Sequence, residues 1–255
     1  MLEKKIITEA NYRYIEVGEG TPVVILHGLM GGLSNFAGVM DYFSNKGYKV
    51  LVPELPVYDL PIINSTVKDL AEFLDGFLNF KKLKEVVLLG NSLGGHVALL
   101  YAKFHPEKVK GLIITGSSGL YENAMGDGYP KRGSYEYIKA KSEEVFYDPK
   151  IATKEIVDEV FESVNDRNKL IRTLAIAKSA IRHNMAKDLP EMHTTTAIIW
   201  GAQDSVTPPN VANEFNALLP NSDLFWIDKC GHAPMMEHPD RFNEIMDLWM
   251  KKYNI

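Results

Sequence analysis

The chain has 255 residues, of which 45% are hydrophobic and 24% are charged. This composition is close to the average for folded globular proteins, and it argues against a disordered or membrane-embedded chain. The formal net charge is −5, with acidic and basic residues interspersed, so nucleic acid is not expected as a partner. The sequence contains no signal peptide and no run of 18 apolar residues, and Cys230 is its single cysteine. We therefore expect a cytoplasmic protein without a membrane span or a disulfide.

Short apolar runs alternate along the chain with segments of helical spacing. The first two predicted strands, 4–8 and 12–17, have no helix between them, which indicates an antiparallel hairpin at a sheet edge. Further strands are predicted at 23–26, 48–52, 86–89, 112–115, 197–200 and 224–227. Because these runs are continuously apolar, we expect a mostly parallel sheet that is buried on both faces. Helices are predicted at 66–80, 93–104 and 241–253.

The alternation stops between about residues 118 and 189. Three helical patterns follow one another there without a strand, at 135–147, 153–164 and 166–186. We therefore predict an all-helical insertion at 119–189, within an α/β core that consists of residues 1–118 and 190–255.

The pentapeptide Gly-Asn-Ser-Leu-Gly at 90–94 matches the G-x-S-x-G pattern, which places a nucleophilic serine on a sharp turn. It follows the predicted strand 86–89 and leads into the helix 93–104, which is the context that this turn requires. The flanking glycines avoid side-chain clashes in such a turn. A Gly-Ser turn without chemical meaning is the alternative, but the neighbouring strand and helix favour Ser92 as a nucleophile.

A serine nucleophile needs a base, and the base needs an acid that orients it. Asp204 follows the predicted strand 197–200, and His232 follows the predicted strand 224–227. Both residues are thus expected at the carboxyl edge of the sheet, where Ser92 also lies. We predict that Asp204 is the acid and His232 the base.

Other residues compete for these roles. Asp204 is also compatible with an ordinary turn, but the other position open to an acid, after the strand 112–115, holds no carboxylate. His96 lies too far back on the predicted helix to act as the base. Cys230 is expected to be a small buried hydrophobe rather than a reactive thiol. Ordinary surface roles fit His105, His183, His193 and His238, which leaves His27 to be considered.

The loop after the strand 23–26 is a candidate for the second half of an oxyanion hole. The tetrahedral intermediate of acyl transfer carries a negative oxygen, which two backbone donors stabilise. We assign the N–H groups of Leu29 and Leu93 to this task. His27 is then expected to hold the loop in place rather than to transfer a proton.

Together these motifs resemble the α/β-hydrolase superfamily over the whole chain: His-Gly at 27–28, the turn at 90–95, Trp-Gly-Ala-Gln-Asp at 200–204 and Gly-His at 231–232. The resemblance implies the α/β-hydrolase fold, with an eight-stranded, mostly parallel sheet flanked by helices. It also implies a helical cap after the sixth strand, with the substrate between cap and core. Members with an aspartate nucleophile, the haloalkane dehalogenases and epoxide hydrolases, are poor models for Ser92.

Two substrate classes compete within this superfamily. Asn91 and Ser-Asn-Phe at 34–36 resemble hydrolases that cleave carbon–carbon bonds in ring-fission products, and Arg182 fits the carboxylate of such a substrate. A solvated helix residue is the alternative for Arg182. The loop 27–32 lacks that group's proline, and Ala233 stands where a tryptophan is common, so we expect a carboxylesterase. The expected substrate contacts are Asn35, Asn91, Met125 and Arg182.

The expected reaction is hydrolysis of a small carboxylic ester through an acyl-enzyme on Ser92. No metal or organic cofactor is expected, because the nucleophile is a side chain and no residues have metal-ligand spacing. The only partner implied is a small-molecule substrate, and no feature indicates an oligomeric state. A ligand-binding receptor or sensor on the same fold is the alternative from another functional class.

Overall fold

A computed structural model describes residues 4–123 and 130–255. In this part of the chain, eight strands form one sheet in the order β1-β2-β4-β3-β5-β6-β7-β8. The strand β2 is antiparallel to both of its neighbours, and β3 to β8 are parallel, which confirms the predicted mostly parallel sheet with a hairpin at its edge. The strands are β1 (Ile7–Glu9), β2 (Tyr12–Val17), β3 (Thr21–Leu26), β4 (Tyr48–Pro53), β5 (Val86–Asn91), β6 (Val109–Thr115), β7 (Thr196–Gly201) and β8 (Ser222–Ile227).

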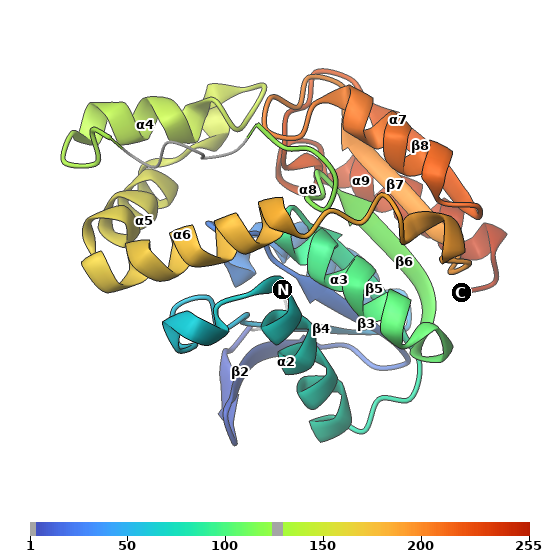
Figure 1. Ribbon diagram of the computed structural model, residues 1–255. Coiled ribbons are helices and arrows are strands. Elements are labelled where there is room, and N and C mark those ends of the chain that lie inside the picture. Colours follow the sequence, from blue (N-terminus) through green and yellow to red (C-terminus); the bar gives the residue numbers. More distant parts are fainter. Residues whose placement is uncertain (1–3, 124–129) are drawn as a thin grey trace.

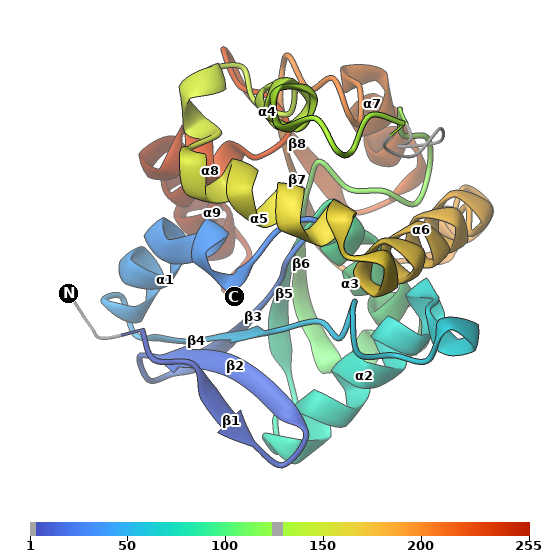
Figure 2. The same cartoon turned by 90° about the vertical axis from the view of Figure 1, so that its left-hand side faces the viewer.

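The central strands are buried on both faces, because helices cover each side of the sheet. Successive residues of β3 show this: Val24 and Leu26 belong to one core, whereas Val23 and Ile25 belong to the other. Figure 2 shows α1 and α9 on one side of the sheet and α2 and α3 on the opposite side. The bounds of these helices are α1 (Ala37–Ser44), α2 (Val67–Phe80), α3 (Leu93–Phe104) and α9 (Pro239–Lys252), with α7 (Pro209–Leu218) and the short α8 (Pro234–Glu237) after β7 and β8.

Among the described residues between β6 and β7, three α-helices form the cap, as predicted: α4 (Tyr135–Glu143), α5 (Lys154–Asn165) and α6 (Arg167–Arg182). The first two pack around a small apolar cluster of their own, which includes Ile138 and Val157. The third helix, α6, extends back across the core beside α3 (Figure 1). Its Ile176 belongs to the same core as Val24 and Leu26 of β3. The boundaries of the cap at 119 and 189 remain our proposal. No helix in the described ranges is long and apolar enough to cross a membrane.

Candidate active site

Ser92 occupies a strained turn between β5 and α3. Its backbone has φ 54° and ψ −121°, a region that residues other than glycine rarely adopt. The turn is also crowded, because a Cβ at Gly94 would lie 2.1 Å from the carbonyl oxygen of Leu26. Only glycine fits at that position. The result is a half-buried serine that is lifted above the carboxyl end of the sheet.

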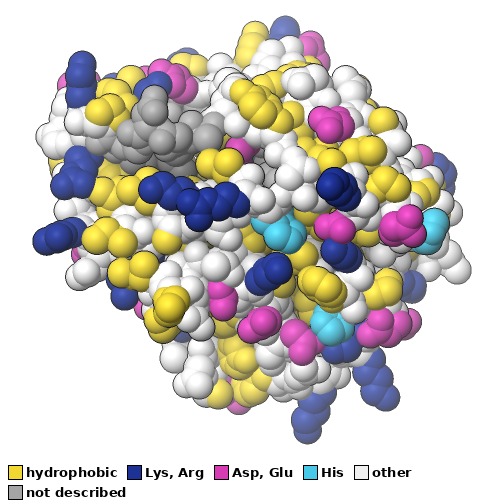
Figure 3. Space-filling view, viewed as in Figure 1, with side chains coloured by type: hydrophobic (Ala, Val, Ile, Leu, Met, Phe, Trp, Pro, Cys, Tyr) yellow, Lys and Arg dark blue, Asp and Glu magenta, His cyan; other side chains and the backbone are white. Residues whose placement is uncertain are grey.

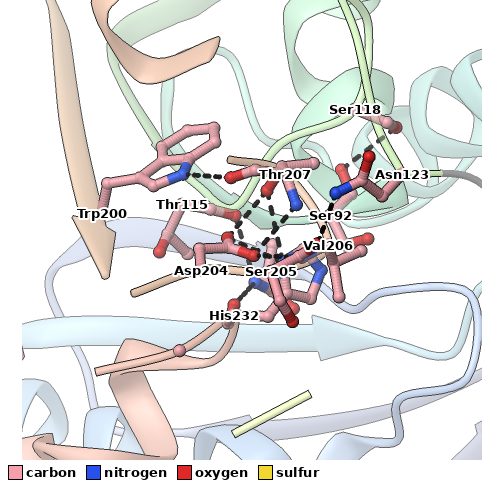
Figure 4. A network of polar contacts seen from close by, with 12 residues as sticks. Ser92, Thr115, Ser118, Asn123, Trp200, Asp204, Ser205, Val206, Thr207 and His232 are labelled. Atoms are coloured by element: carbon pink, nitrogen blue, oxygen red, sulfur yellow. Dashed lines mark hydrogen bonds and ion pairs between the residues drawn. The ribbon is translucent and has the colours of Figure 1, made fainter. Parts of the chain in front are cut away.

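His232 and Asp204 form a buried pair at the same edge, after β8 and β7. His232 Nδ1 lies 2.9 Å from Asp204 Oδ2, and both side chains are buried. Burial lowers the pKa of His232, but the charge of Asp204 and its hydrogen bond raise it, so that the pKa lies above its ordinary value. Figure 4 draws both side chains in the same network of polar contacts as Ser92, whose neighbour Asn91 donates to the carbonyl oxygen of His232 over 3.1 Å. The three residues that we predicted as nucleophile, acid and base therefore lie together.

Thr207 is a positioning residue for this pair that sequence reasoning missed. Its hydroxyl donates to Asp204 Oδ2 over 2.8 Å and lies 3.3 Å from His232 Nδ1. The backbone N–H groups of Val206 and Thr207 donate to the other carboxylate oxygen over 2.8 Å and 2.9 Å. Both oxygens of Asp204 are thus held in place, which fixes the direction in which the carboxylate meets the imidazole.

Gly116 explains why the first residue after β6 is not an acid. Its φ is +50°, and a Cβ added to it would lie 2.8 Å from His232 Nδ1. Since even a methyl group would push against the imidazole ring, this position is closed to a carboxylate side chain.

Asn91 has backbone partners. Its amide Nδ2 donates to the carbonyl oxygens of Thr115 and His232, over 3.1 Å in each case. The side chain, which we expected to contact the substrate, is buried and ties the histidine loop to the ends of β5 and β6.

The loop after β3 lies against the nucleophile, as the predicted oxyanion hole requires. A Cβ on Gly28 would lie 3.2 Å from Ser92 Cβ. The loop is held by His27, whose Nδ1–H donates to Gly28 O and whose Nε2 accepts from the Leu55 N–H, both over 2.9 Å. Burial lowers the pKa of His27, which favours this neutral form. Among the loop and turn hydrogen bonds of the described residues, none uses the N–H of Leu29 or Leu93.

The other expected substrate contacts are dispersed. The side chain of Asn35 lies against the loop after β3, where a Cβ on Gly31 would come within 2.9 Å of its Nδ2. Arg182 is exposed at the end of α6 and lines a groove on the outside of the molecule, which contains none of the three clustered residues. Met125 lies outside the described residues.

Two glutamates near the site also escaped sequence reasoning. Glu122 follows β6 and is anchored by its neighbour Asn123, whose N–H donates to Val206 O over 2.7 Å. Burial raises the pKa of Glu122, and its charge helps to raise that of His232. Glu237 accepts from the N–H groups of Gly231 and Tyr147 over 2.7 Å each, which joins the histidine loop to the cap. Glu122 belongs to no motif, so no sequence signal marked it, whereas Glu237 stands in the Glu-His-Pro segment at 237–239 that follows the Gly-His motif.

A second histidine pair lies behind Ser92. His96 Nε2 is 3.0 Å from His183 Nδ1, and His96 Nδ1 is 3.4 Å from the hydroxyl of Ser118. The N–H of Ser118 in turn donates to the carbonyl oxygen of Ser92 over 3.2 Å. Burial and the neighbouring His183 lower the pKa of His96 to about 3. This chain of contacts links the end of α6 to the nucleophile turn.

Cys230 is buried next to the histidine loop, and burial raises the pKa of its thiol. A thiol in this state is a poor nucleophile. Among the residues that the structure describes, no three His, Cys, Asp or Glu side chains are grouped in a way that could hold a metal ion.

The chain is similar in sequence and in fold to known hydrolases. The model of the alpha/beta hydrolase family matches residues 23–245. A 2-hydroxy-6-oxononadienedioate/2-hydroxy-6-oxononatrienedioate hydrolase of Pseudomonas sp is 27% identical over 250 residues, which cover 91% of this chain and 88% of that protein. Other relatives of 25–28% identity carry the same name.

Two solved structures are similar over nearly the whole chain. One is MGS-MChE2, an alpha/beta hydrolase enzyme from the metagenome of lagoon sediments of Mar Chica, Morocco, with 55% identity, a TM-score of 0.83 and coverage of 98% of this chain and 100% of that one. The other is a putative lipase from Acinetobacter baumannii AYE, with 25% identity, a TM-score of 0.82 and coverage of 95% and 88%.

Proposed function

We propose, since the chain belongs to the alpha/beta hydrolase family and is a hydrolase, that Ser92 is its nucleophile, His232 its base and Asp204 its orienting acid. One observation carries this proposal: the buried 2.9 Å contact between His232 Nδ1 and Asp204 Oδ2 lies at the sheet edge where the strained turn presents Ser92. This contact leaves Nε2 of His232 as the nitrogen that can accept the serine proton.

In the proposed reaction, His232 Nε2 takes the hydroxyl proton while Ser92 Oγ attacks the substrate carbonyl carbon. The N–H groups of Leu29 and Leu93 donate to the resulting oxyanion. The bond to the leaving group then breaks, and the protonated His232 returns the proton to that group. A water molecule, deprotonated by His232, attacks the acyl-enzyme and releases the carboxylic acid and free Ser92.

A carbon–carbon bond next to a ketone is the first candidate for the bond that breaks. It is supported by relatives of 25–28% identity that are named as hydrolases of 2-hydroxy-6-oxononadienedioate. In this reaction the proton from His232 goes to the carbon of the leaving fragment. Such a substrate carries two carboxylates, which the protein has to accommodate.

The charges near the proposed site favour a second candidate, the hydrolysis of a small neutral ester. Glu122 lies close enough to His232 to influence its pKa. A small cavity at the loop after β3 is lined by Glu54, Asp59 and Glu159, and by no Lys or Arg. Glu54 is paired with Arg13 over 3.1 Å, but Asp59 and Glu159 have no such partner among the described residues. Because like charges repel, these two carboxylates and Glu122 disfavour a dianionic substrate and leave a neutral one unaffected.

One experiment separates these candidates. Purified protein and Ser92→Ala are incubated with p-nitrophenyl esters of two to ten carbons and, separately, with a coloured ring-fission dienoate. Rapid loss of the dienoate with little ester turnover would establish the carbon–carbon reaction, and the reverse result would establish the esterase. Equal rates for wild type and Ser92→Ala would refute the assignment of the nucleophile. Binding without any turnover would favour a receptor or sensor instead.

A further inference from the structure

A groove of about 740 Å³ lies between the start of α2 and the side of α6. Two hydrogen bonds join its two sides: the Val67 N–H donates to Ser179 Oγ over 3.2 Å, and Arg172 Nε donates to Leu60 O over 2.9 Å. These bonds hold the segment before α2 and the helix α6 together, which favours a preformed groove. Its apolar lining consists of Ile62, Val67, Ile171, Leu174 and Ala175.

The charged side chains of the groove are all cations. Lys68, Lys178 and Arg182 line it, and no aspartate or glutamate does. Within residues 4–123 and 130–255, none of these three cations forms an ion pair. By contrast, Lys103 pairs with Asp188 over 2.7 Å. Figure 3 looks onto this face, where Lys and Arg side chains lie beside hydrophobic ones over α6.

The groove is separate from the proposed active site. Ser92, Asp204 and His232 do not line it, whereas His183 does. His183 is also the residue that contacts the buried His96 over 3.0 Å. A ligand in the groove would therefore lie next to a histidine whose signals can be followed, and would leave the triad unoccupied.

We propose that this groove is a second binding site, and that it takes a small organic carboxylate with an apolar chain or an aromatic ring. The apolar wall removes the hydrocarbon part from water, and the three cations attract the carboxylate and donate hydrogen bonds to it. The volume lies within the range of sites that hold one small molecule. Neither a neutral alcohol nor an inorganic anion uses both features.

The binding of decanoate tests this proposal. Isothermal titration calorimetry is performed with the wild-type protein, using decanoate and decanol as ligands, and with Lys178→Gln/Arg182→Gln. We expect saturable binding of decanoate, and binding that is weaker by about tenfold or more both for decanol and for the double variant. Lys150→Gln removes an exposed cation that does not line the groove, and it is expected to leave decanoate binding unchanged.

The apolar wall is tested by a matched pair of variants. Ile171 and Ile181 lie on the same helix and are 37% and 44% exposed, but only Ile171 lines the groove. We expect Ile171→Ser to weaken decanoate binding by about threefold or more, and Ile181→Ser to leave it unchanged. Thermal melts confirm that each variant is folded.

The ligand's position is read from the histidine side-chain NMR signals. Decanoate in the groove shifts the signals of His183, whereas decanoate at the proposed active site shifts those of His232. The proposal is refuted if decanoate shifts the signals of His232 alone, or if decanol binds as tightly as decanoate. It is also refuted if the double variant binds decanoate as tightly as the wild type. It is also refuted if the protein binds vesicles that contain anionic lipid but not free decanoate, because the occupant is then a lipid surface. Since the triad is not involved, all of these results are independent of whether Ser92 is the nucleophile.

Discussion

Two buried histidines near Ser92, His232 and His96, have different partners. His232 contacts the carboxylate of Asp204, and its pKa is raised above the ordinary value. His96 contacts another histidine and a serine hydroxyl, and its pKa is lowered to about 3. Both rings are buried, so burial alone does not make a base. The carboxylate partner compensates for the loss of water around a charged imidazole, and this compensation lets His232 accept a proton.

The two histidines also differ in how they are connected to the serine. His232 reaches the site from a loop after β8 and is therefore independent of the helix that carries the nucleophile. His96 lies on that helix, and it acts on Ser92 only through Ser118 and the backbone. We therefore infer that His96 is a structural residue that supports the nucleophile turn and that His232 is the catalytic base. The following predictions test this distinction, beginning with the largest effect.

Asp204→Asn should lower kcat/KM by about 10³- to 10⁴-fold, as loss of the acid does in other enzymes that use this triad. The amide has no charge to stabilise the imidazolium of His232, so the pKa of His232 should fall. Because a base acts only when neutral, kcat/KM of the wild type rises as the pH increases through this pKa. In the variant that rise should occur at lower pH. A pH–rate profile of both proteins checks this, and an unshifted acid limb would contradict it.

Gly116→Ala should lower activity by about 10²-fold, because the added methyl group would lie 2.8 Å from His232 Nδ1 and displace the ring. The backbone φ of +50° adds strain to any substitution there. Gly133→Ala is a useful control, since nothing lies within 4 Å of a Cβ at that glycine. Steady-state kinetics and thermal melts of the two variants separate lost geometry from lost stability.

Much of this arrangement is encoded in local sequence. The turn around Ser92 requires small residues at fixed offsets, and parallel strands deliver their following loops to one edge of the sheet. For these reasons the sheet, the helical insertion and the proximity of Ser92, Asp204 and His232 could be predicted. The helices α1 and α7 were missed, since they are only 8 and 10 residues long and such short segments do not show a clear helical period.

The residues that support the site could not be predicted in the same way. Glu122 acts on His232, which is distant in the sequence, and Glu237 joins Gly231 to the distant Tyr147. Thr207 contacts the nearby Asp204, but a threonine three residues after an aspartate has no distinctive pattern. Arg182 shows the opposite problem: its place at the end of a cap helix fitted a substrate contact, but the helix directs it to the outside groove. Helical spacing predicts which residues share a face, but not what that face packs against.

Thr207→Val should lower kcat/KM by about three- to tenfold. The variant keeps the shape of the side chain but loses the hydroxyl that donates to Asp204 Oδ2 over 2.8 Å, and one such hydrogen bond contributes about 1 kcal/mol. Thr207→Ser restores the hydroxyl and should recover most of the activity. If both variants had the same rate, the hydroxyl would have no part in holding the carboxylate.

His96→Gln should affect stability more than catalysis, with kcat/KM changed by less than about threefold. Because the pKa of His96 is lowered in the folded state, the unfolded chain takes up a proton as the pH falls below about 6.5, whereas the folded chain does not. The wild type should therefore lose stability between pH 7 and pH 5 through this residue, by at most about 2 kcal/mol. The variant lacks this titration, so its stability deficit at pH 7 should shrink at pH 5. Urea unfolding at both pH values measures the difference, with the exposed His193→Gln as a control. A large loss of kcat together with a shifted pH–rate profile in His96→Gln would instead place the second histidine pair in proton transfer, and the contrast between the two pairs would not hold.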